Sequence, residues 1–345
     1  MPLTTSQRKA IEYGGKNLQL IACAGSGKTE VVARRVVYLL DPPTQPVLAP
    51  RNIIAFTFTE KAAAELKERI ITRCREVLGP VPGLAEMFVG TIHAFCLELL
   101  KSEIAEYLRF EVLNEVQQSL FVDRHSKRAG LTECTDLLGA PLKRYKDTQR
   151  YLAALDILRE ADLSEQALNG CSLLSGLESY SVLLKDRSYL DYSAILEAAV
   201  DVLTNDQALR GRIKDRIRCV IVDEYQDVNP IQEAIIWSLQ ELGASICVVG
   251  DDDQTIYQWR GSDVQNILTF KTRYQGVDQI ALEENFRSSD GVVETARTFI
   301  AQNRNRLPKE MNARADPWHS RLARYKLPTS LPVGGRAWRR QEMPH

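Results

Sequence analysis

The chain has 345 residues, of which 44% are hydrophobic and 26% charged, and its formal net charge is −1. This is the composition of a folded protein long enough for about two or three domains with sizeable cores. It excludes a surface that binds nucleic acid through overall positive charge. Any nucleic-acid site must therefore be a local groove.

The seven cysteines are scattered, with no CxxC pair, and fit neither a zinc site nor a framework of disulfides. The N-terminal residues lack the apolar stretch of a secretory signal peptide. No window approaches the run of about 18 apolar residues that a membrane span needs. These features predict a cytoplasmic protein with reduced thiols and no membrane contact.

Short apolar runs bounded by turn residues or helical patterns predict five buried strands. The runs are Leu18–Ala22, Ile53–Phe58, Val220–Val222, Ile246–Val249 and Gln279–Leu282. After the second run, apolar residues recur at steps of three or four from Ala63 to Val77, which gives a helix with one apolar face. Strands followed by amphipathic helices predict an α/β protein with a parallel sheet covered on both faces.

Residues 94–214 have a different sequence pattern. Strand-like runs disappear, and stretches rich in Leu, Ala, Glu, Lys and Arg, such as Gln149–Ala161 and Tyr192–Leu203, are typical of helices. We interpret this region as a mostly helical domain inserted between two halves of one sheet. The two halves are residues 1–93 and 215–280.

A new unit is expected to begin near Ala281 and to extend over residues 281–313, with a helix from Asp290 to about Asn303. Residues 314–345 differ again, because seven basic residues stand against two acidic ones, with four prolines and no periodicity. A nucleic-acid-binding tail, a disordered end, and out-of-frame translation after a lesion in a longer gene all fit this composition. We favour a disordered or non-native tail over a functional one.

The strongest local motif is Ala22-Cys-Ala-Gly-Ser-Gly-Lys-Thr29, between a predicted strand and a predicted helix. Gly25 and Gly27 allow the backbone to turn its N–H groups around phosphate oxygens, and the dipole of the following helix favours anions. Lys28 is expected to reach the β- and γ-phosphates and Thr29 to ligate Mg²⁺. The predicted nucleotide-binding residues of this loop are Ala22, Cys23, Ala24, Gly25, Ser26, Gly27, Lys28 and Thr29. The alternative is a glycine-rich turn without a nucleotide, since Ala22 stands where the general pattern has glycine.

A second motif, Cys219-Val-Ile-Val-Asp-Glu-Tyr-Gln-Asp227, is an apolar strand that ends in adjacent carboxylates. Such a strand delivers acids to the edge of the sheet where the phosphate loop lies. Asp223 is expected to hold Mg²⁺ and Glu224 to activate the attacking water. An acidic pair after a strand is often only a solvated strand end, but beside a phosphate loop it predicts hydrolysis of ATP with Mg²⁺.

Taken together, the motifs resemble, in the same order, the signatures of the UvrD/PcrA/Rep branch of superfamily 1 helicases. Besides the phosphate loop, the matching segments are Leu3-Thr-x-x-Gln7, Thr57–Ala63, Gly90–Phe95, Asp223–Asn229, Val249–Gly261 and Leu282–Ser288, of which Asp223–Asn229 overlaps the second motif above. They span residues 3 to about 290. The resemblance implies a RecA-like P-loop NTPase sheet with an inserted helical domain, followed by a fragment of a second RecA-like domain.

The resemblance also implies roles for further residues at the nucleotide. Gln7 would bond the adenine edge, and Phe286 would stack on the adenine ring. Gln254 and Arg287 would contact the γ-phosphate. With Lys28 and Glu224, these last two complete the expected catalytic group.

Other matching residues would line the path of single-stranded DNA, because stacked aromatic rings hold any base. They are Thr57, Phe58, Thr91, His93, Tyr257 and Trp259. Core packing is the alternative for Phe58 and Trp259, and an ordinary hydrogen-bonded histidine is the alternative for His93.

Several positions depart from the family pattern. Cys23 replaces a glycine of the phosphate loop, Glu30 stands where an arginine near the base is common, and Phe286 replaces a tyrosine. The later motifs of the family, including its arginine finger, have no counterpart after Arg287. The expected activity is ATP-dependent 3′→5′ DNA unwinding, with single-stranded and tailed duplex DNA as partners, by an N-terminal portion of such a helicase.

Three alternatives stay open. The chain could be a truncated module that binds ATP and DNA with little or no unwinding. It could be a subunit completed by a second polypeptide that supplies the other half of the motor. It could also be a phosphate-loop ATPase without a nucleic-acid role, against which the segments at 57–63 and 249–261 argue. The pathway, whether repair, replication restart or plasmid transfer, is not indicated.

Overall fold

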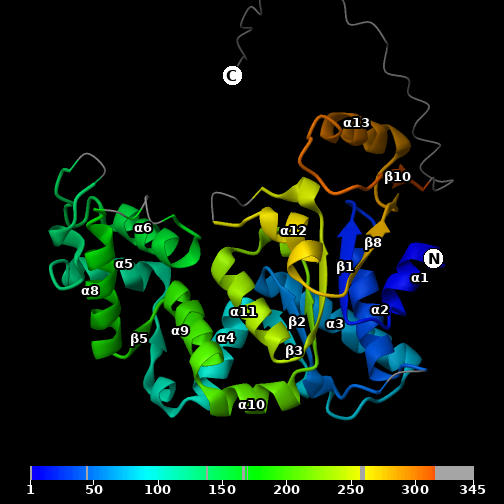
Figure 1. The fold of residues 1–345 in the computed structure, drawn as a ribbon, viewed down its shortest axis with the longest axis horizontal. Helices are drawn as coiled ribbons and strands as arrows, with labels where there is room; N and C mark the ends of the chain where they lie inside the picture. The colour runs from blue at the N-terminus through cyan, green and yellow to red at the C-terminus, as the bar shows by residue number, and fades with distance from the viewer. Residues whose placement is uncertain are drawn as a thin grey trace, which may run out of the picture.

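The computed structural model describes residues 2–43, 46–136, 139–164, 168, 170–256 and 261–314. Its centre is a six-stranded sheet in the order β3-β2-β6-β7-β1-β8, and every pairing in it is parallel (Figure 1). The strands are β1 (Asn17–Ala22), β2 (Ile53–Thr57), β3 (Phe88–Thr91), β6 (Cys219–Val222), β7 (Ser245–Gly250) and β8 (Val277–Leu282). The five expected strands are present with their ends shifted by a residue or two. The sequence missed the sixth, β3, at one edge of the sheet.

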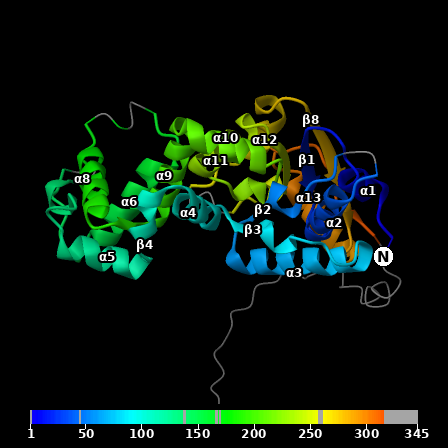
Figure 2. The same cartoon turned by 90° about the horizontal axis from the view of Figure 1, so that it is seen from below.

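Helices cover both faces of the sheet, as expected. Successive side chains of a strand point to opposite faces, so Cys219 and Ile221 pack on one side while Val220 and Val222 pack on the other. The first side is covered by α1, α2 and α3, and the second by α4, α9, α10, α11 and α12. Figure 2 shows the sheet between α3 and the group α10–α12.

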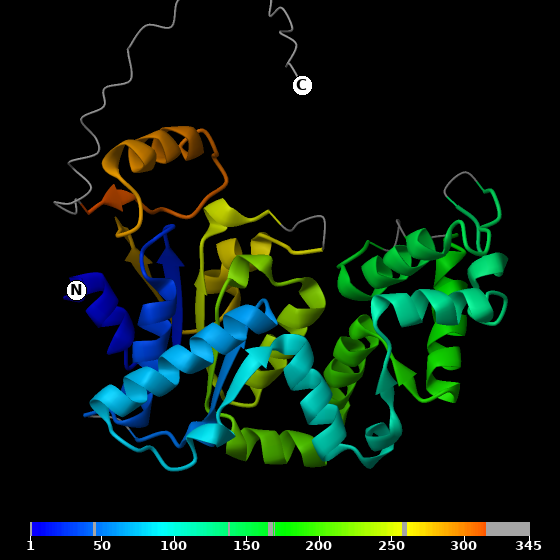
Figure 3. The same cartoon turned by 180° about the vertical axis from the view of Figure 1, so that it is seen from behind.

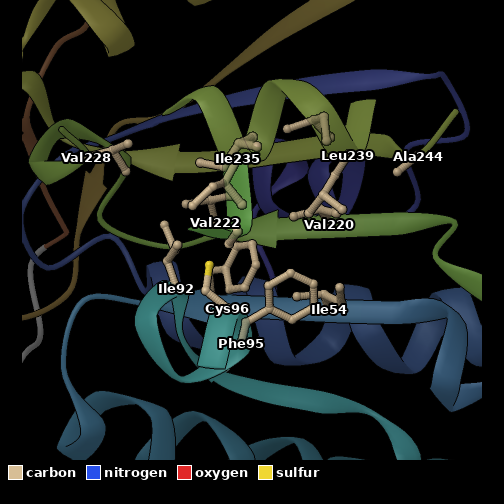
Figure 4. Packing of buried hydrophobic residues seen from close by; sticks show 14 of the residues in the cluster. Ile54, Ile92, Phe95, Cys96, Val220, Val222, Val228, Ile235, Leu239 and Ala244 are labelled. Atoms are coloured by element: carbon tan, nitrogen blue, oxygen red, sulfur yellow. The ribbon is translucent and has the colours of Figure 1, made fainter. Parts of the chain in front are cut away.

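The bounds of these helices are α1 (Thr5–Ile11), α2 (Lys28–Leu40), α3 (Glu60–Val77), α4 (Ile92–Glu103), α9 (Tyr192–Asn205), α10 (Gln207–Arg216), α11 (Pro230–Glu241) and α12 (Gln265–Arg273). Short 3-10 helices cover Pro50–Asn52, Leu84–Glu86, Ala105–Arg109, Leu131–Glu133, Tyr225–Asp227 and Asp252–Gln254. Figure 4 shows the second face from close by, where Val220 and Val222 lie between Ile235 and Leu239 of α11 and Phe95 and Cys96 of α4.

The region predicted to be helical has a core of its own. It is built by α5 (Glu115–Arg124), α6 (Thr148–Glu160) and α8 (Leu173–Asp186), and Tyr151, Leu155 and Tyr180 are buried at its centre. Two strands of two residues each, β4 (Glu111–Val112) and β5 (Tyr189–Leu190), pair in parallel beside it. The helices α4, α9 and α10, which flank this core in the sequence, pack on the sheet instead. The helical insert is therefore anchored by its first and last helices.

The chain leaves the sheet after β8, which pairs with β1 along its whole length. The boundary expected near Ala281 thus falls inside the last strand. Beyond it, β9 (Glu284–Asn285) pairs with β10 (Asn312–Ala313), and α13 (Asp290–Ile300) lies between them in sequence. Figure 3 shows α13 beyond the ends of β1 and β8. The predicted tail, from residue 315 onward, lies outside the described residues.

Across these described ranges, no helix combines the length and the apolar character that crossing a membrane requires.

Candidate functional site

The residues predicted to bind the phosphates and Mg²⁺ follow the carboxyl ends of the sheet's strands. Because all six strands are parallel, the segments that follow them emerge at one edge of the sheet. The phosphate loop follows β1, the acidic pair follows β6, and Asp251 follows β7. These three strands are neighbours in the order β6-β7-β1, so residues from distant parts of the sequence meet there.

The phosphate loop has the backbone that its glycines predict. Gly25 and Gly27 have φ of 72° and 80°, in the left-handed region that favours glycine. Lys28 is the first residue of α2, and no side chain caps that helix. Its first backbone N–H groups are therefore suited to bind an anion such as phosphate.

The loop's cation and the predicted base are in direct contact. Lys28 Nζ lies 2.6 Å from Glu224 Oε2, and the same oxygen accepts a hydrogen bond of 2.9 Å from Gln226 Nε2. Glu224 has a φ of 52°, a left-handed conformation that costs a residue with a side chain about 1–3 kcal/mol. Binding of a nucleotide would require Lys28 to exchange this carboxylate for phosphate oxygens.

Two acids of this edge, Asp223 and Asp227, have raised pKa values. Burial, followed by the charge of Glu224, raises the pKa of Asp223 to about 6, although Lys28 opposes the shift. The pKa of Asp227 is raised to about 6 for the same reasons. A bound divalent cation would favour the ionised form of Asp223.

Magnesium fits the donor atoms available here. In proteins Mg²⁺ is commonly bound through one or two carboxylates together with phosphate oxygens and waters. The carboxylate of Asp223 and the hydroxyl of Thr29 are oxygen donors of this kind. Across the described ranges, this edge included, no group of three or more His, Cys, Asp or Glu side chains could hold a metal ion without such additional ligands.

Gln7 touches the loop and also caps α1. Its Nε2 donates to the backbone oxygen of Ser26 at 3.0 Å, and its Oε1 accepts from the backbone N of Thr4 at 3.0 Å. An amide side chain has two N–H groups and two lone pairs. One of each is left with which Gln7 could bond an adenine, and that role stays a prediction.

The residues after β8 dock on the phosphate loop. The backbone N of Phe286 donates to the oxygen of Gly25 at 3.0 Å, and Asn285 Nδ2 donates to the oxygen of Ala24 at 2.8 Å. A Cβ placed on Gly25 would come within 2.9 Å of the Cβ of Arg287. Arg287 is thus attached beside the loop. The guanidinium of Arg314 lies over the Phe286 ring, 5.4 Å from its centroid.

Two departures from the family pattern have their own partners. Cys23 is buried and its thiol donates to the backbone oxygen of Glu310 at 3.2 Å. Burial raises the pKa of this thiol to about 12, which keeps it protonated and unreactive. Glu30 forms ion pairs with Arg34 at 2.6 Å and Arg73 at 2.9 Å.

Some of the predicted DNA residues lie at two neighbouring strand ends. Thr57 and Thr91 are direct partners in the pairing of β2 and β3, and Phe58, half-buried, follows Thr57. Thr91 Oγ1 accepts from the backbone N of Ala94, which caps α4. Tyr257 and Trp259 lie outside the described residues.

His93 is half-buried, and its ring packs edge-on against Tyr192 at 5.8 Å. Burial lowers the pKa of His93 to about 4. The imidazole is therefore neutral at pH 7, so it can form hydrogen bonds to DNA but offers no charge to a phosphate.

Comparison with known proteins decides the family. The chain matches the model of the UvrD/REP helicase N-terminal domain over residues 3–275. The chain belongs to this family. The expectation of a RecA-like α/β fold, which the resemblance carried, is confirmed by this match together with the parallel sheet.

The relatives are longer than this chain. The ATP-dependent DNA helicase PcrA of Bacillus subtilis is 31% identical over 320 residues, which cover 90% of this chain and 41% of the relative. The ATP-dependent DNA helicase UvrD1 of Mycobacterium leprae is 30% identical over 329 residues, with 90% and 40% covered. PcrA of Staphylococcus aureus strain Mu50 is 28% identical, with 89% and 41% covered.

Sequence reasoning missed two residues of this UvrD/REP-type site. Gln226 joins two motifs, because its Nε2 donates to Glu224 and its Oε1 accepts from the backbone N of Asp251 at 3.0 Å. Its place within Asp223–Asn229 was the available signal. Lys309 contacts Asp251 at 2.6 Å across 58 residues of sequence, and no motif marked it.

Proposed function

We propose that the chain binds ATP with Mg²⁺ and hydrolyses it, and that in the motor to which it belongs this hydrolysis drives 3′→5′ translocation on single-stranded DNA and unwinding of duplexes. The observation that carries the proposal is the 2.6 Å contact between Lys28 and Glu224 at the ends of β1 and β6. It brings the lysine of the predicted phosphate loop and the carboxylate predicted to act as the base to one point. The names of the relatives, ATP-dependent DNA helicases, support it.

The chemistry follows from the residues at this edge. Lys28 and the backbone N–H groups of the loop would bind the phosphates, and Thr29 and Asp223 would hold Mg²⁺, which neutralises charge as it develops. Glu224 would take a proton from the water that attacks the γ-phosphorus. The bond to the β–γ bridging oxygen breaks, and ADP and inorganic phosphate leave. Gln254 and Arg287 would contact the γ-phosphate.

The DNA path would run over the ends of β2 and β3 and the segment after β7. Thr57, Phe58, Thr91 and His93 lie at the first two places, and Tyr257 and Trp259 belong in sequence to the third. Stacking on aromatic rings is independent of base identity. That suits a motor that moves along any sequence, and single-stranded or tailed duplex DNA is the partner we propose. A cytoplasmic location is proposed with it.

Hydrolysis of ATP by the purified chain, measured with and without single-stranded DNA, tests the proposal. We expect phosphate release that rises when DNA is added and disappears in Lys28→Ala. A rate that DNA leaves unchanged, with the Lys28→Ala loss intact, would indicate an ATPase without a nucleic-acid role. No Lys28-dependent release at all would reject the proposal.

A second candidate is a module that binds ATP and DNA with little unwinding of its own. It is favoured because Arg287 is the one residue after β8 that the resemblance assigns to the γ-phosphate. The sequence has no counterpart of the family's arginine finger after it. An arginine finger is worth about 10³–10⁵ in turnover in phosphoryl transfer. We therefore expect residues 1–345 alone to hydrolyse ATP slowly and not to displace a strand from a duplex with a 3′ tail. Strand displacement that Lys28→Ala abolishes would reject this candidate. Displacement only after addition of another polypeptide would indicate a two-part motor.

A further inference from the structure

A buried lysine lies against the segment that follows β7. Lys309 Nζ is 2.6 Å from Asp251 Oδ1 and 3.1 Å from Asp253 Oδ2, and it also contacts Asp252 Oδ1. The Lys309 side chain has no solvent exposure. One ammonium group therefore binds three consecutive carboxylates, which come directly before Gln254.

Lys309 is one of two cations that neutralise these three carboxylates. Arg306 adds a second cation, with two hydrogen bonds to Asp253 at 2.6 and 3.0 Å, and the backbone N of Leu307 donates to Asp252 at 2.8 Å. Burial alone would lower the pKa of Lys309, but Asp251 and Asp252 outweigh burial and raise the pKa above its usual value. Lys309 thus stays charged at neutral pH. Without it, two buried carboxylates would lack a cation beside a site for polyphosphate, and like charges close together repel.

The contact reaches the proposed γ-phosphate residue through one carboxylate. Asp251 Oδ1 accepts from Lys309, and Asp251 Oδ2 accepts from Gln254 Nε2 at 2.5 Å. The backbone N of Asp251 donates to Gln226, whose amide in turn donates to Glu224. The orientation of Gln254 therefore depends on how Asp251 is held, and Lys309 holds it.

We propose that Lys309 is a positioning residue of the nucleotide site: by fixing Asp251 it orients Gln254 toward the γ-phosphate, and so gives the chain its preference for ATP over ADP. This proposal rests on the proposed function. Arg306 provides the matched comparison, because it ties the same segment to the sheet through Asp253 and has no contact with Asp251. A purely structural role would make the two cations equivalent.

The test compares the affinities of the purified 345-residue chain for Mg-ADP and for a non-hydrolysable Mg-ATP analogue by calorimetry. For Lys309→Met we expect the affinity for the ATP analogue to fall about tenfold, since a hydrogen bond to a charged group is worth at least that much, with little change for ADP. Arg306→Gln should leave the ratio of the two affinities as in the parent. Lys28→Ala should weaken binding of both nucleotides.

An unchanged ratio in a folded Lys309→Met would overturn the proposal, and so would an equal loss for both nucleotides. Thermal unfolding without nucleotide shows whether the variant folds. If it does not, Asp251→Asn decides, because an amide there must present its NH₂ group to either Lys309 or Gln254, both of which are donors. That variant should lose the preference for ATP, and a retained preference would overturn the proposal. A parent that binds neither nucleotide would reject the proposed function itself, whereas a parent that binds both leaves only the role of Lys309 at stake.

Discussion

The phosphate-loop edge and the helical insert each contain an ion pair, but the two pairs differ in burial. In the insert, Arg159 lies 3.0 Å from Asp191, and the side chains are 1% and 2% exposed. At the edge, Lys28 lies 2.6 Å from Glu224, and the side chains are 13% and 36% exposed. The first pair is enclosed by partners, whereas the second is open to an incoming ligand.

The insert pair and its partners involve four helices. Asp191 also caps α9 through the backbone N of Ala194 and accepts from Gln118 of α5. Arg159 of α6 donates to Ser181 of α8 at 2.7 Å. Such additional hydrogen bonds offset the cost of taking two charges out of water. This pair is part of how the insert folds.

At the edge, strain and unpaired atoms accompany the ion pair. Ser26 Oγ and Asp227 Oδ1 are buried without a hydrogen-bond partner, and Glu224 has a left-handed backbone. Native structures concentrate such features at functional sites. The comparison teaches that burial of charge alone does not mark a site. Unpaired buried atoms alone do not mark it either, because Arg159 Nε and Tyr180 Oη in the insert also lack a hydrogen-bond partner. What distinguishes the edge is a charged pair that is open to a ligand and that includes a residue with a left-handed backbone.

The largest effect is expected at the edge. Lys28→Ala removes the loop's lysine opposite the predicted β- and γ-phosphates, so Mg-ATP binding should weaken sharply and hydrolysis should disappear. Equilibrium binding and phosphate release measure the two effects. Because the Lys28–Glu224 pair is partly exposed, the unfolding midpoint should change little. Loss of folding in this variant would instead make the edge pair resemble the insert pair.

Glu224→Gln is the matched variant on the other side of the same contact. It keeps the Mg²⁺ ligand Asp223 and removes the base, so the chain should bind Mg-ATP but not turn it over. Hydrolysis at the parent's rate would show that another group activates the water.

In the insert, substitution of Arg159 should lower the stability of the fold and leave nucleotide binding unchanged. Arg159→Met leaves Asp191 buried without its cation, and breaking such a pair costs about 3–5 kcal/mol. Urea unfolding measures the change, and nucleotide affinity of the folded variant should equal the parent's. Arg150→Met, on the same helix but with its arginine 85% exposed, is the control and should be near neutral. Equal effects of the two variants would contradict the comparison.

The sequence predicted best what depends on local pattern. Continuous apolar runs mark the strands buried on both faces, and the loop from Ala22 to Thr29 carries its own glycines. The edge strand β3 has no such run, since Phe88, Val89 and Thr91 are only half-buried. The role of Lys309 could not be predicted from the sequence, because only folding brings this residue into contact with the three carboxylates.

A smaller effect is expected on DNA. Trp259 lies outside the described residues, and its stacking on a base is predicted from the sequence alone. Trp259→Ala should lower the affinity for single-stranded DNA by about 1–3 kcal/mol, with a log–log salt slope of about −0.7 per phosphate neutralised. Fluorescence anisotropy measures both. Trp237→Ala is the control, because that ring packs on Tyr274, at the end of α12, at 5.0 Å and is not among the residues assigned to the proposed path. Equal affinities of the parent and Trp259→Ala would place the ring in the core.

The smallest effect concerns pH, and it arises where α6 meets α9. Ser193 Oγ lies 2.9 Å from Asp156 Oδ1 and also contacts Glu160 Oε1. A hydroxyl has one proton to donate, so satisfying both contacts requires a proton on one of the carboxyls. Burial raises the pKa of Asp156 and of Glu160, and nearby Asp191 adds to both shifts while Arg159 opposes them.

Raised pKa values in the folded state fix the sign of the pH dependence. The stability that this cluster contributes is fully present below the unfolded values of 3.8 and 4.5 and is lost as pH rises through the higher folded values. In Asp156→Asn the amide can donate to Ser193, which then donates to Glu160, so no shared proton is needed. The free energy of unfolding from urea titrations between about pH 4 and 8 should therefore fall less steeply with pH in this variant than in the parent. Glu178→Gln, an exposed acid on α8, should keep the parent's slope. If Asp156→Asn kept the parent's slope too, the two carboxyls would not share a proton in the parent. Ser193 would then lie between two ionised carboxylates with one proton to donate.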